Sequence, residues 1–303
     1  MKQTLLYLCI SLFLVGCQYA WSQPIPDGDI VYMTFSDGID ELGFVNPDGS
    51  DNQIIEIDEK FAKPVWSNDG KILYGLSGSA QAGAYGGHPA YWDLERGYYR
   101  ICTGRIPFYY QIQGSDNADN PYEVIIMRVR EIIVMDLDKC EQVQTLVDYS
   151  AYPNYEIEGF SYSSSRQELV YGLVVNPYKN PKYKIMLLDI KTGEKKQLAE
   201  GINPSWSLDG TKIAYLGLDG LYVILSNGEE PRQLSYRQPT DLFRYRWGPL
   251  PRWSPDGEWL VYHRCIKEQE YCLLEYEWIY KIRTSDGAEE CIAAGGKYPS
   301  WRP

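Results

Sequence analysis

Short alternating and apolar segments, separated by glycine-containing turns, follow one another along most of the chain. Residues 212–215 alternate polar and apolar side chains, and residues 184–189 form an apolar run that ends in an aspartate. Alternation with a period of two predicts β-strands with one buried face. Residues 191–193 (Lys-Thr-Gly) are a turn signal of the kind that closes a hairpin. The pattern predicts an all-β protein.

A motif of the form Pro-x-Trp-Ser-x-Asp-Gly recurs at 64–70, 204–210 and 251–257, and degenerate copies begin at Phe160, Pro107 and Pro299. The aromatic positions of the six copies, which include Tyr109 and Tyr162, are separated by about 47 residues on average, the spacing of four-stranded propeller blades. In each turn the Asp carboxylate accepts from backbone N–H groups and the Gly supplies a positive φ. We assign a structural role to the repeated residues because most copies contain them: Trp66, Asp69, Gly70, Trp206, Asp209, Gly210, Trp253, Asp256, Gly257 and Trp301.

Third strands followed by a turn occur six times, which predicts six blades. They are expected at 41–49, 90–97, 132–139, 184–193, 221–228 and 278–287. Residues 29–32 form a second strand that has no first strand before it, and residues 299–303 form a first strand that has no second strand after it. Pairing these two ends completes one blade and closes the ring, which removes open sheet edges. Residues 27–303 are therefore expected to form one six-bladed β-propeller of four-stranded antiparallel blades.

The repeat resembles the TolB-like family of WD-like β-propeller repeats, over about residues 27–303. The resemblance implies a platform for protein interactions, and related propellers gate peptidases of the prolyl oligopeptidase group. We expect a protein other than TolB itself, because the separate N-terminal α/β domain of TolB has no counterpart here and a lipobox-like sequence occurs where TolB is soluble and periplasmic.

The N-terminal residues have the features of an export signal. Lys2 is followed by an apolar segment too short to span a bilayer permanently. The segment ends in Leu14-Val15-Gly16-Cys17, which resembles the bacterial lipobox. We assign 1–16 as a lipoprotein signal peptide and 17–26 as the lipidated Cys17 and a short linker, so that the lipid is the only attachment to a membrane. The alternative is an ordinary signal peptide.

Charge and cysteine content limit the ligands. The formal net charge is −12, which disfavours nucleic acid as a partner. We expect no cofactor and no metal site, because only two histidines are present and no cysteines form a C-x-x-C pair. Cys265 and Cys272 flank a predicted hairpin and form the first candidate disulfide, and Cys102 with Cys140 is the second.

The sequence contains no catalytic motif. A G-x-S-x-G nucleophile turn is absent, and no phosphate-binding glycine loop is complete. His88 lies in a loop of small residues, and His263 follows a predicted strand as a structural histidine. We therefore expect a binding protein. The alternatives are a glycan-active propeller hydrolase that uses a carboxylate pair and an accessory propeller for a separately encoded peptidase.

Four aromatic insertions interrupt the blade rhythm, at 77–91, 109–122, 148–158 and 235–250. Loops on a rigid scaffold carry binding residues, and Tyr, Trp and Arg are enriched at binding hot spots. The candidate ligand-binding residues are Tyr85, His88, Tyr91, Tyr109, Tyr110, Tyr152, Tyr155, Tyr236, Arg237, Arg244, Tyr245, Arg246 and Trp247. The predicted function is that of a membrane-tethered, non-catalytic scaffold for a protein, a peptide or an envelope glycan. The oligomeric state stays open.

Overall fold

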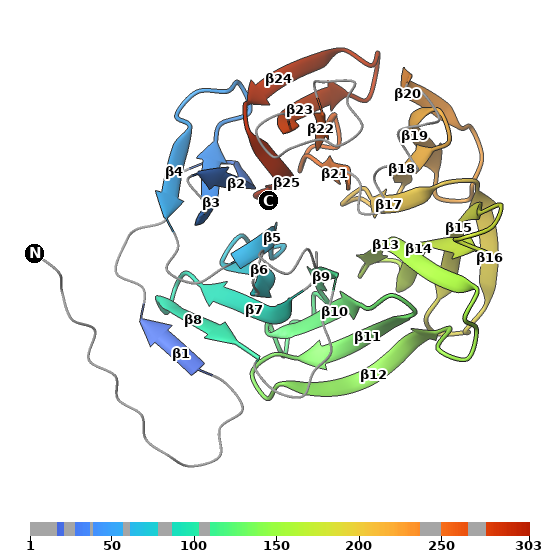
Figure 1. The fold of residues 1–303 in the computed structure, drawn as a ribbon, viewed down its shortest axis with the longest axis horizontal. Coiled ribbons are helices and arrows are strands. Elements are labelled where there is room, and N and C mark those ends of the chain that lie inside the picture. Colours follow the sequence, from blue (N-terminus) through green and yellow to red (C-terminus); the bar gives the residue numbers. More distant parts are fainter. Residues whose placement is uncertain are drawn as a thin grey trace, which may run out of the picture.

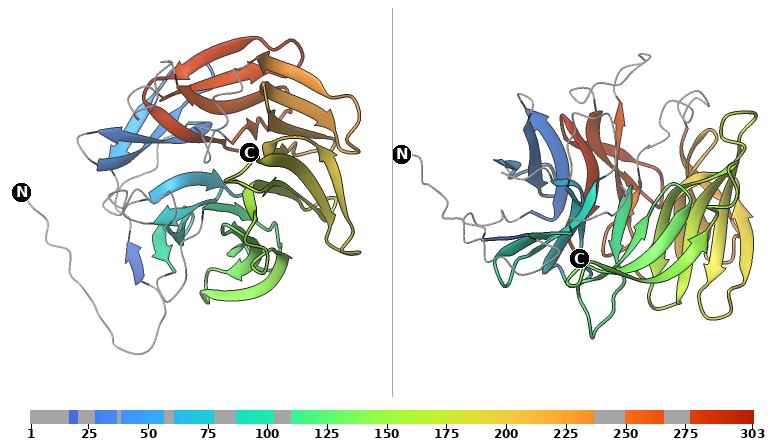
Figure 2. Two further views of the ribbon diagram at one scale, coloured as in Figure 1. Left: turned by 45° about the vertical axis from the view of Figure 1, so that its right-hand side comes forward. Right: turned by 60° about the horizontal axis from the view of Figure 1, so that its bottom comes forward.

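The computed structural model describes residues 17–20, 28–36, 39–56, 61–77, 87–102, 110–236, 250–265 and 277–303. Within these ranges the chain forms strands and no helix, and no segment of them qualifies as a membrane-crossing helix. Six antiparallel sheets are arranged around a ring (Figure 1), and the turned views show them standing side by side as blades (Figure 2). The predicted six-bladed β-propeller is confirmed.

Each blade contains four strands, which follow one another in sequence from the centre of the ring to its rim except in blade 1, where the C-terminal strand is innermost. The strands are as follows: blade 1, β25 (Gly296–Trp301), β2 (Ile30–Ser36), β3 (Ile39–Val45) and β4 (Gln53–Glu56); blade 2, β5 (Phe61–Trp66), β6 (Ile72–Ser77), β7 (His88–Asp93) and β8 (Tyr98–Ile101); blade 3, β9 (Gln111–Gly114), β10 (Glu123–Met127), β11 (Glu131–Asp136) and β12 (Glu141–Asp148); blade 4, β13 (Tyr155–Ser163), β14 (Glu168–Val175), β15 (Lys182–Asp189) and β16 (Lys195–Ala199); blade 5, β17 (Ile202–Trp206), β18 (Lys212–Gly217), β19 (Gly220–Leu225) and β20 (Arg232–Tyr236); blade 6, β21 (Arg252–Trp253), β22 (Trp259–Cys265), β23 (Glu277–Arg283) and β24 (Glu289–Ala293).

The two ends of the propeller meet in blade 1, as the sequence predicted. β25 pairs antiparallel with β2, so that Trp301 lies opposite Ile30 and Ser300 opposite Val31. The pairing converts two half-blades into one sheet and leaves no open first strand at the junction.

One strand lies outside the regular blades. β1 (Cys17–Ala20) pairs antiparallel with β8 at the rim of blade 2, with Cys17 opposite Ile101 and Ala20 opposite Tyr98 (Figure 1). These residues belong to the segment assigned from the sequence as a linker, and the sequence pattern did not predict that they add a fifth strand.

The hydrophobic core lies between neighbouring blades. Ile125 and Met127 of β10, for example, pack in one cluster with Phe160 of β13 and Tyr171 of β14. Phe160 and Tyr171 are fully buried. Burial of each such large apolar side chain stabilises the fold by about 1.5–3 kcal/mol, so blade-to-blade packing makes the ring one unit.

The antiparallel order gives the ring two distinct faces. The Ser-x-Asp-Gly turns join first to second strands, and they share one face with the turns that join third to fourth strands; we call it the Trp-turn face. The opposite face holds the connections from second to third strands and from one blade to the next. It also receives the ends of the insertions at 77–91, 148–158 and 235–250, and we call it the insertion face.

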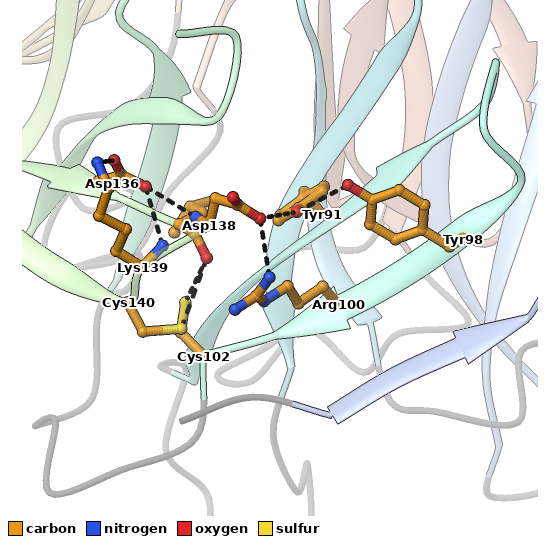
Figure 3. The surroundings of a disulfide bond; sticks show 9 residues. Tyr91, Tyr98, Arg100, Cys102, Asp136, Asp138, Lys139 and Cys140 are labelled. Carbon is orange, nitrogen blue, oxygen red and sulfur yellow. Dashed lines mark hydrogen bonds and ion pairs between the residues drawn. A yellow bond between two sulfur atoms is a disulfide. The ribbon is translucent and has the colours of Figure 1, made fainter. Parts of the chain in front are cut away.

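A disulfide joins blades 2 and 3 (Figure 3). Cys102, directly after β8, is bonded to Cys140 in the turn between β11 and β12, with a Cα–Cα distance of 5.3 Å. Beside it, Arg100 Nη1 lies 2.8 Å from Asp138 Oδ1. The second candidate pair from the sequence is thus confirmed. The first candidate, Cys265 with Cys272, is not tested, because Cys272 lies outside the described residues.

Candidate functional site

The repeated Ser-x-Asp-Gly residues build turns, as predicted. Ser67 Oγ donates to Asp69 Oδ1 at 2.7 Å, and the same Asp69 oxygen accepts from the backbone of Lys71. Gly70 has a φ of +67°. The copies at Asp209 and Asp256 make the same serine-to-aspartate bond. These carboxylates are occupied by their own turns, which supports a structural role over a catalytic one.

Blade 3 departs from the predicted register of the repeat. Its innermost strand is β9, and Gly114 pairs with Val124 as Trp66 pairs with Leu73 in blade 2. Gly114, and not Tyr109, therefore occupies the aromatic position of this copy. A Cβ atom on Gly114 would lie 3.0 Å from the ring of Tyr74, so the ring of the neighbouring blade takes up the space. The prediction for Tyr109 was wrong because it relied on a degenerate motif.

Three tyrosines of one predicted insertion come together on the insertion face, and we call them, with Tyr178, the tyrosine cluster. The rings of Tyr152 and Tyr155 are stacked, with centroids 5.4 Å apart and an interplanar angle of 17°. Tyr149 meets both rings edge-on, at 6.2 Å and 5.3 Å. Tyr152 is 55% exposed. The connection from blade 3 to blade 4 therefore presents a stacked aromatic surface to the outside.

Tyr178 extends the same surface from the β14–β15 connection. Its side chain is 78% exposed, and its hydroxyl donates to Glu156 Oε1 at 2.9 Å. The Tyr149 hydroxyl lies 2.9 Å from the hydroxyl of the fully buried Tyr171. These hydrogen bonds hold the rings of Tyr149 and Tyr178 in position in the protein without a ligand. Preorganised rings lose little conformational freedom on binding.

The other predicted ligand contacts do not join this cluster. Tyr236 is 68% exposed at the end of β20 in blade 5, Tyr110 is half-buried beside β9, and His88 is half-buried at the start of β7. Within the described part of the chain, Tyr236 has no hydrogen bond or ring contact with the cluster. The candidates that fall outside the described residues are Tyr85, Tyr109, Arg237, Arg244, Tyr245, Arg246 and Trp247.

Tyr91 is a core residue, which corrects its assignment as a ligand contact. Its side chain is completely buried, its ring centroid lies 4.7 Å from that of Tyr122, and its hydroxyl donates to Asp138 at 3.4 Å (Figure 3). Tyr91 is the last residue of the predicted insertion, but it stands on a third strand, β7, whose side chains pack between blades.

The centre of the ring holds a second set of residues, which the sequence analysis missed. Three of them, Lys63, Asn203 and Tyr298, have φ values between +51° and +54°. Each precedes a proline and lies in a bulge of an innermost strand. A β-bulge redirects a side chain out of the regular pleat. All three line a cavity of about 50 Å³ at the insertion end of the ring axis. The signal in the sequence was a polar residue directly before the motif proline.

Lys63 has an unusual environment in this cavity. Its Nζ donates to the backbone oxygen of Tyr110 at 2.7 Å and lies 5.1 Å from the ring centroid of Tyr298. The pKa of the Lys63 ammonium is lowered to about 7, mainly by burial. The charge of Glu158 raises this pKa, and the charge of Lys297 lowers it. Burial also lowers the pKa of Lys297, to about 8, and this lysine is paired with Glu277.

In the described part of the chain, His263 has a structural environment. His263 is buried, and its Nδ1 accepts from the backbone of Tyr298 at 3.2 Å, so its predicted structural role is confirmed. Across the ranges that the structure describes, no three His, Cys, Asp or Glu side chains are grouped so that they could hold a metal ion.

Several solved structures have a fold similar to that of this chain. No family model matches the sequence, and no curated protein matches it. Among solved structures, TolB from Acinetobacter baumannii is similar with a TM-score of 0.62 and 17% identity, over 91% of this chain and 68% of that one. One chain of a nidogen/laminin complex gives a TM-score of 0.65 and 10% identity, over 90% of this chain and 98% of that one. An oligogalacturonate lyase in complex with manganese gives 0.53 and 16%, over 92% and 74%. At these identities the likeness shows the fold alone, which is that of a β-propeller.

Proposed function

We propose that the propeller is a membrane-tethered, non-catalytic scaffold, and that the tyrosine cluster on its insertion face binds a protein or peptide partner in the cell envelope. The main observation is that the exposed ring of Tyr152 stacks on the half-buried ring of Tyr155. Exposed aromatic rings held by their neighbours offer a large contact area at small entropic cost, which is the chemistry of interface hot spots.

The position of β1 supports a tether on this same face. β8 runs from the turn that follows β7 toward the insertion face, and Cys17 lies opposite Ile101, at the end of that strand. A lipid attached at Cys17 would therefore hold the propeller by the face that carries the tyrosine cluster. This geometry favours a partner that is itself at or near the membrane surface.

A capture experiment tests the proposed binding. The full chain, solubilised from membranes, is compared with a Tyr152→Ala/Tyr178→Ala variant and with Val143→Ala as matched control. Val143 is likewise exposed, at 59%, but stands on the rim strand β12. A partner that the wild type and Val143→Ala retain, and that binds the tyrosine variant at least tenfold more weakly once purified, supports the proposal.

Two outcomes would refute it. Equal affinity of all three proteins for the captured partner removes the tyrosine cluster from the interface. Turnover of a purified envelope polysaccharide by the wild type, with release of new reducing ends, makes the protein an enzyme. The tether is tested separately by labelling with an alkyne-tagged fatty acid, which Cys17→Ser should abolish.

A further inference from the structure

The axis of the ring contains two adjoining cavities. The larger, of about 100 Å³, lies toward the Trp-turn face, and the smaller, of about 50 Å³, lies toward the insertion face. Val65 and Arg252 line both of them. The two cavities are therefore successive parts of one axial channel, and Arg252 stands where they adjoin.

The channel is lined by one equivalent position from every blade. The residue before the aromatic position of each innermost strand contributes to the larger cavity. These six residues are Val65, Gln113, Ser161, Ser205, Arg252 and Ser300. Arg252 is the only charged member of this ring of side chains.

The Arg252 guanidinium has no partner within the described part of the chain. The guanidinium forms no hydrogen bond, ion pair or ring contact with the described residues, whereas the Arg252 backbone pairs with Val261 and its oxygen accepts from Trp301 Nε1 at 3.1 Å. Burial alone lowers the pKa of Arg252 to about 10. The Arg252 side chain is half-buried in the wall of the channel. A partly desolvated charge is stabilised by a counter-charge. The missing counter-charge points to an anionic ligand.

Serine hydroxyls supply further donors around the same cavity. Ser161 Oγ accepts from the backbone of Trp206 at 3.1 Å, and Ser300 Oγ accepts from the backbone of Trp66 at 3.4 Å. Neither hydroxyl donates a hydrogen bond to a described acceptor. Ser205 Oγ has no hydrogen bond to the described residues at all. Three hydroxyl donors and five guanidinium N–H donors therefore face a cavity with few acceptors.

Two carboxylates line the channel, and neither neutralises Arg252. Asp116 lies in the larger cavity, where it accepts from Ser164 and Asn68, and burial raises its pKa. Glu158 lies in the smaller cavity, where its charge raises the pKa of Lys63. The described charged residues of the channel are thus Arg252 and Lys63 against Asp116 and Glu158, and of these only Arg252 lines both cavities.

We propose that the axial channel binds a small carboxylate, with the Arg252 guanidinium as its charge partner and the hydroxyls of Ser161, Ser205 and Ser300 as additional donors. A planar carboxylate fits the fork of a guanidinium. A single negative charge is repelled less by the acidic chain than a phosphate dianion is. This site is separate from the tyrosine cluster of the proposed function.

Acetate is the probe, and acetamide is its neutral isostere. Thermal unfolding of the full chain is followed as acetate replaces chloride at constant ionic strength and pH 7. We expect a saturable rise in Tm with acetate and none with acetamide. Saturation-transfer NMR on the acetate methyl group measures the same binding directly.

Three variants decide the assignment. Arg252→Met should weaken acetate binding at least tenfold, Ser205→Ala should weaken it severalfold, and Arg283→Met, which removes an exposed arginine paired with Asp286, should leave it unchanged. Ser205→Ala removes a hydroxyl that makes no hydrogen bond in the described structure, so it tests the site even if Arg252→Met does not fold. Equal responses to acetate and acetamide, acetate binding that neither channel variant alters, or tighter binding of inorganic phosphate would each overturn the proposal.

Discussion

The side-chain amide of Gln111 in blade 3 forms two hydrogen bonds with the backbone of Phe160 in blade 4. Gln111 Nε2 donates to the Phe160 oxygen at 2.7 Å, and Gln111 Oε1 accepts from the Phe160 nitrogen at 3.1 Å. Gln113 repeats the arrangement with Tyr162. Elsewhere in the ring a serine hydroxyl accepts from the backbone of the next blade, as Ser161 does from Trp206. The blade that has lost the repeat motif is thus joined to its neighbour by glutamine amides.

Gln111→Met should lower the free energy of unfolding by about 2–4 kcal/mol, because it leaves one buried N–H and one buried C=O of Phe160 without partners. The measurement is urea denaturation. Gln142→Met is the control. The Gln142 side chain donates to the exposed Thr145 and, among the described residues, forms no other hydrogen bond, so the change in stability should be less than about 0.5 kcal/mol. A loss no greater than that of the control would show that the amide pairs do not hold the two blades together.

The fold could be read from the sequence because its signal is repeated, whereas the channel could not. Pro-x-Trp-Ser-x-Asp-Gly fixes a turn through local hydrogen bonds, and three clear copies set the period for the others. In blade 3 the repeat is not recognisable from the sequence. Gly114 occupies the aromatic position there, and the ring of Tyr74 from blade 2 fills the space of the missing side chain. Such a replacement depends on a tertiary contact that no local pattern records.

The candidate site was only partly predictable for the same reason. Tyr152 and Tyr155 are close in sequence, and their stacking follows from one short connection. Arg252 stands at an unremarkable position of the motif, where other copies have Val65, Ser205 and Ser300. Its significance depends on six strands converging on one axis, which places that position inside a channel.

The turn glycines offer a test of the repeat in two matched copies. Gly257 has a φ of +72°, and a Cβ atom there would meet nothing within 4 Å. Gly257→Ala should therefore cost about 1–2 kcal/mol, the penalty of the left-handed conformation alone. Gly210→Ala adds a contact of 2.9 Å with Arg166 Cδ and should cost somewhat more. Urea denaturation of both variants checks the order, and a neutral Gly257→Ala would contradict the positive-φ explanation.

The disulfide between Cys102 and Cys140 closes a loop with a sequence separation of 38. Constraint of the unfolded chain by a loop of this length is worth about 3–4 kcal/mol. Cys102→Ser/Cys140→Ser should lower the Tm by about 10 °C, and dithiothreitol should have no further effect on the variant. Cys291→Ser is the control, because Cys291 is an exposed free thiol. A Tm equal to that of the wild type would show that other contacts, such as Arg100 with Asp138, hold the two blades.

Lys63 should make the stability depend on pH in the neutral to alkaline range. Its folded pKa of about 7 is below its ordinary value of 10.5, so between these values the unfolded chain binds more protons than the folded one. The free energy of unfolding should then rise as the pH increases from 7 to 9.5, where the raised tyrosine pKa values do not yet act. Since Lys63 is half-buried, we expect a rise of about 1–2 kcal/mol.

Lys63→Met should abolish most of this rise, because it removes the group that must lose its proton on folding. The remaining slope belongs to Lys297, whose folded pKa is about 8. Lys71→Met is the control: the ion pair with Glu95 raises the pKa of Lys71, so this exposed lysine stays protonated in both states across the window. Urea denaturation at four pH values separates the cases. An identical pH slope in the wild type and in Lys63→Met would mean that the Lys63 ammonium is fully solvated at the channel mouth.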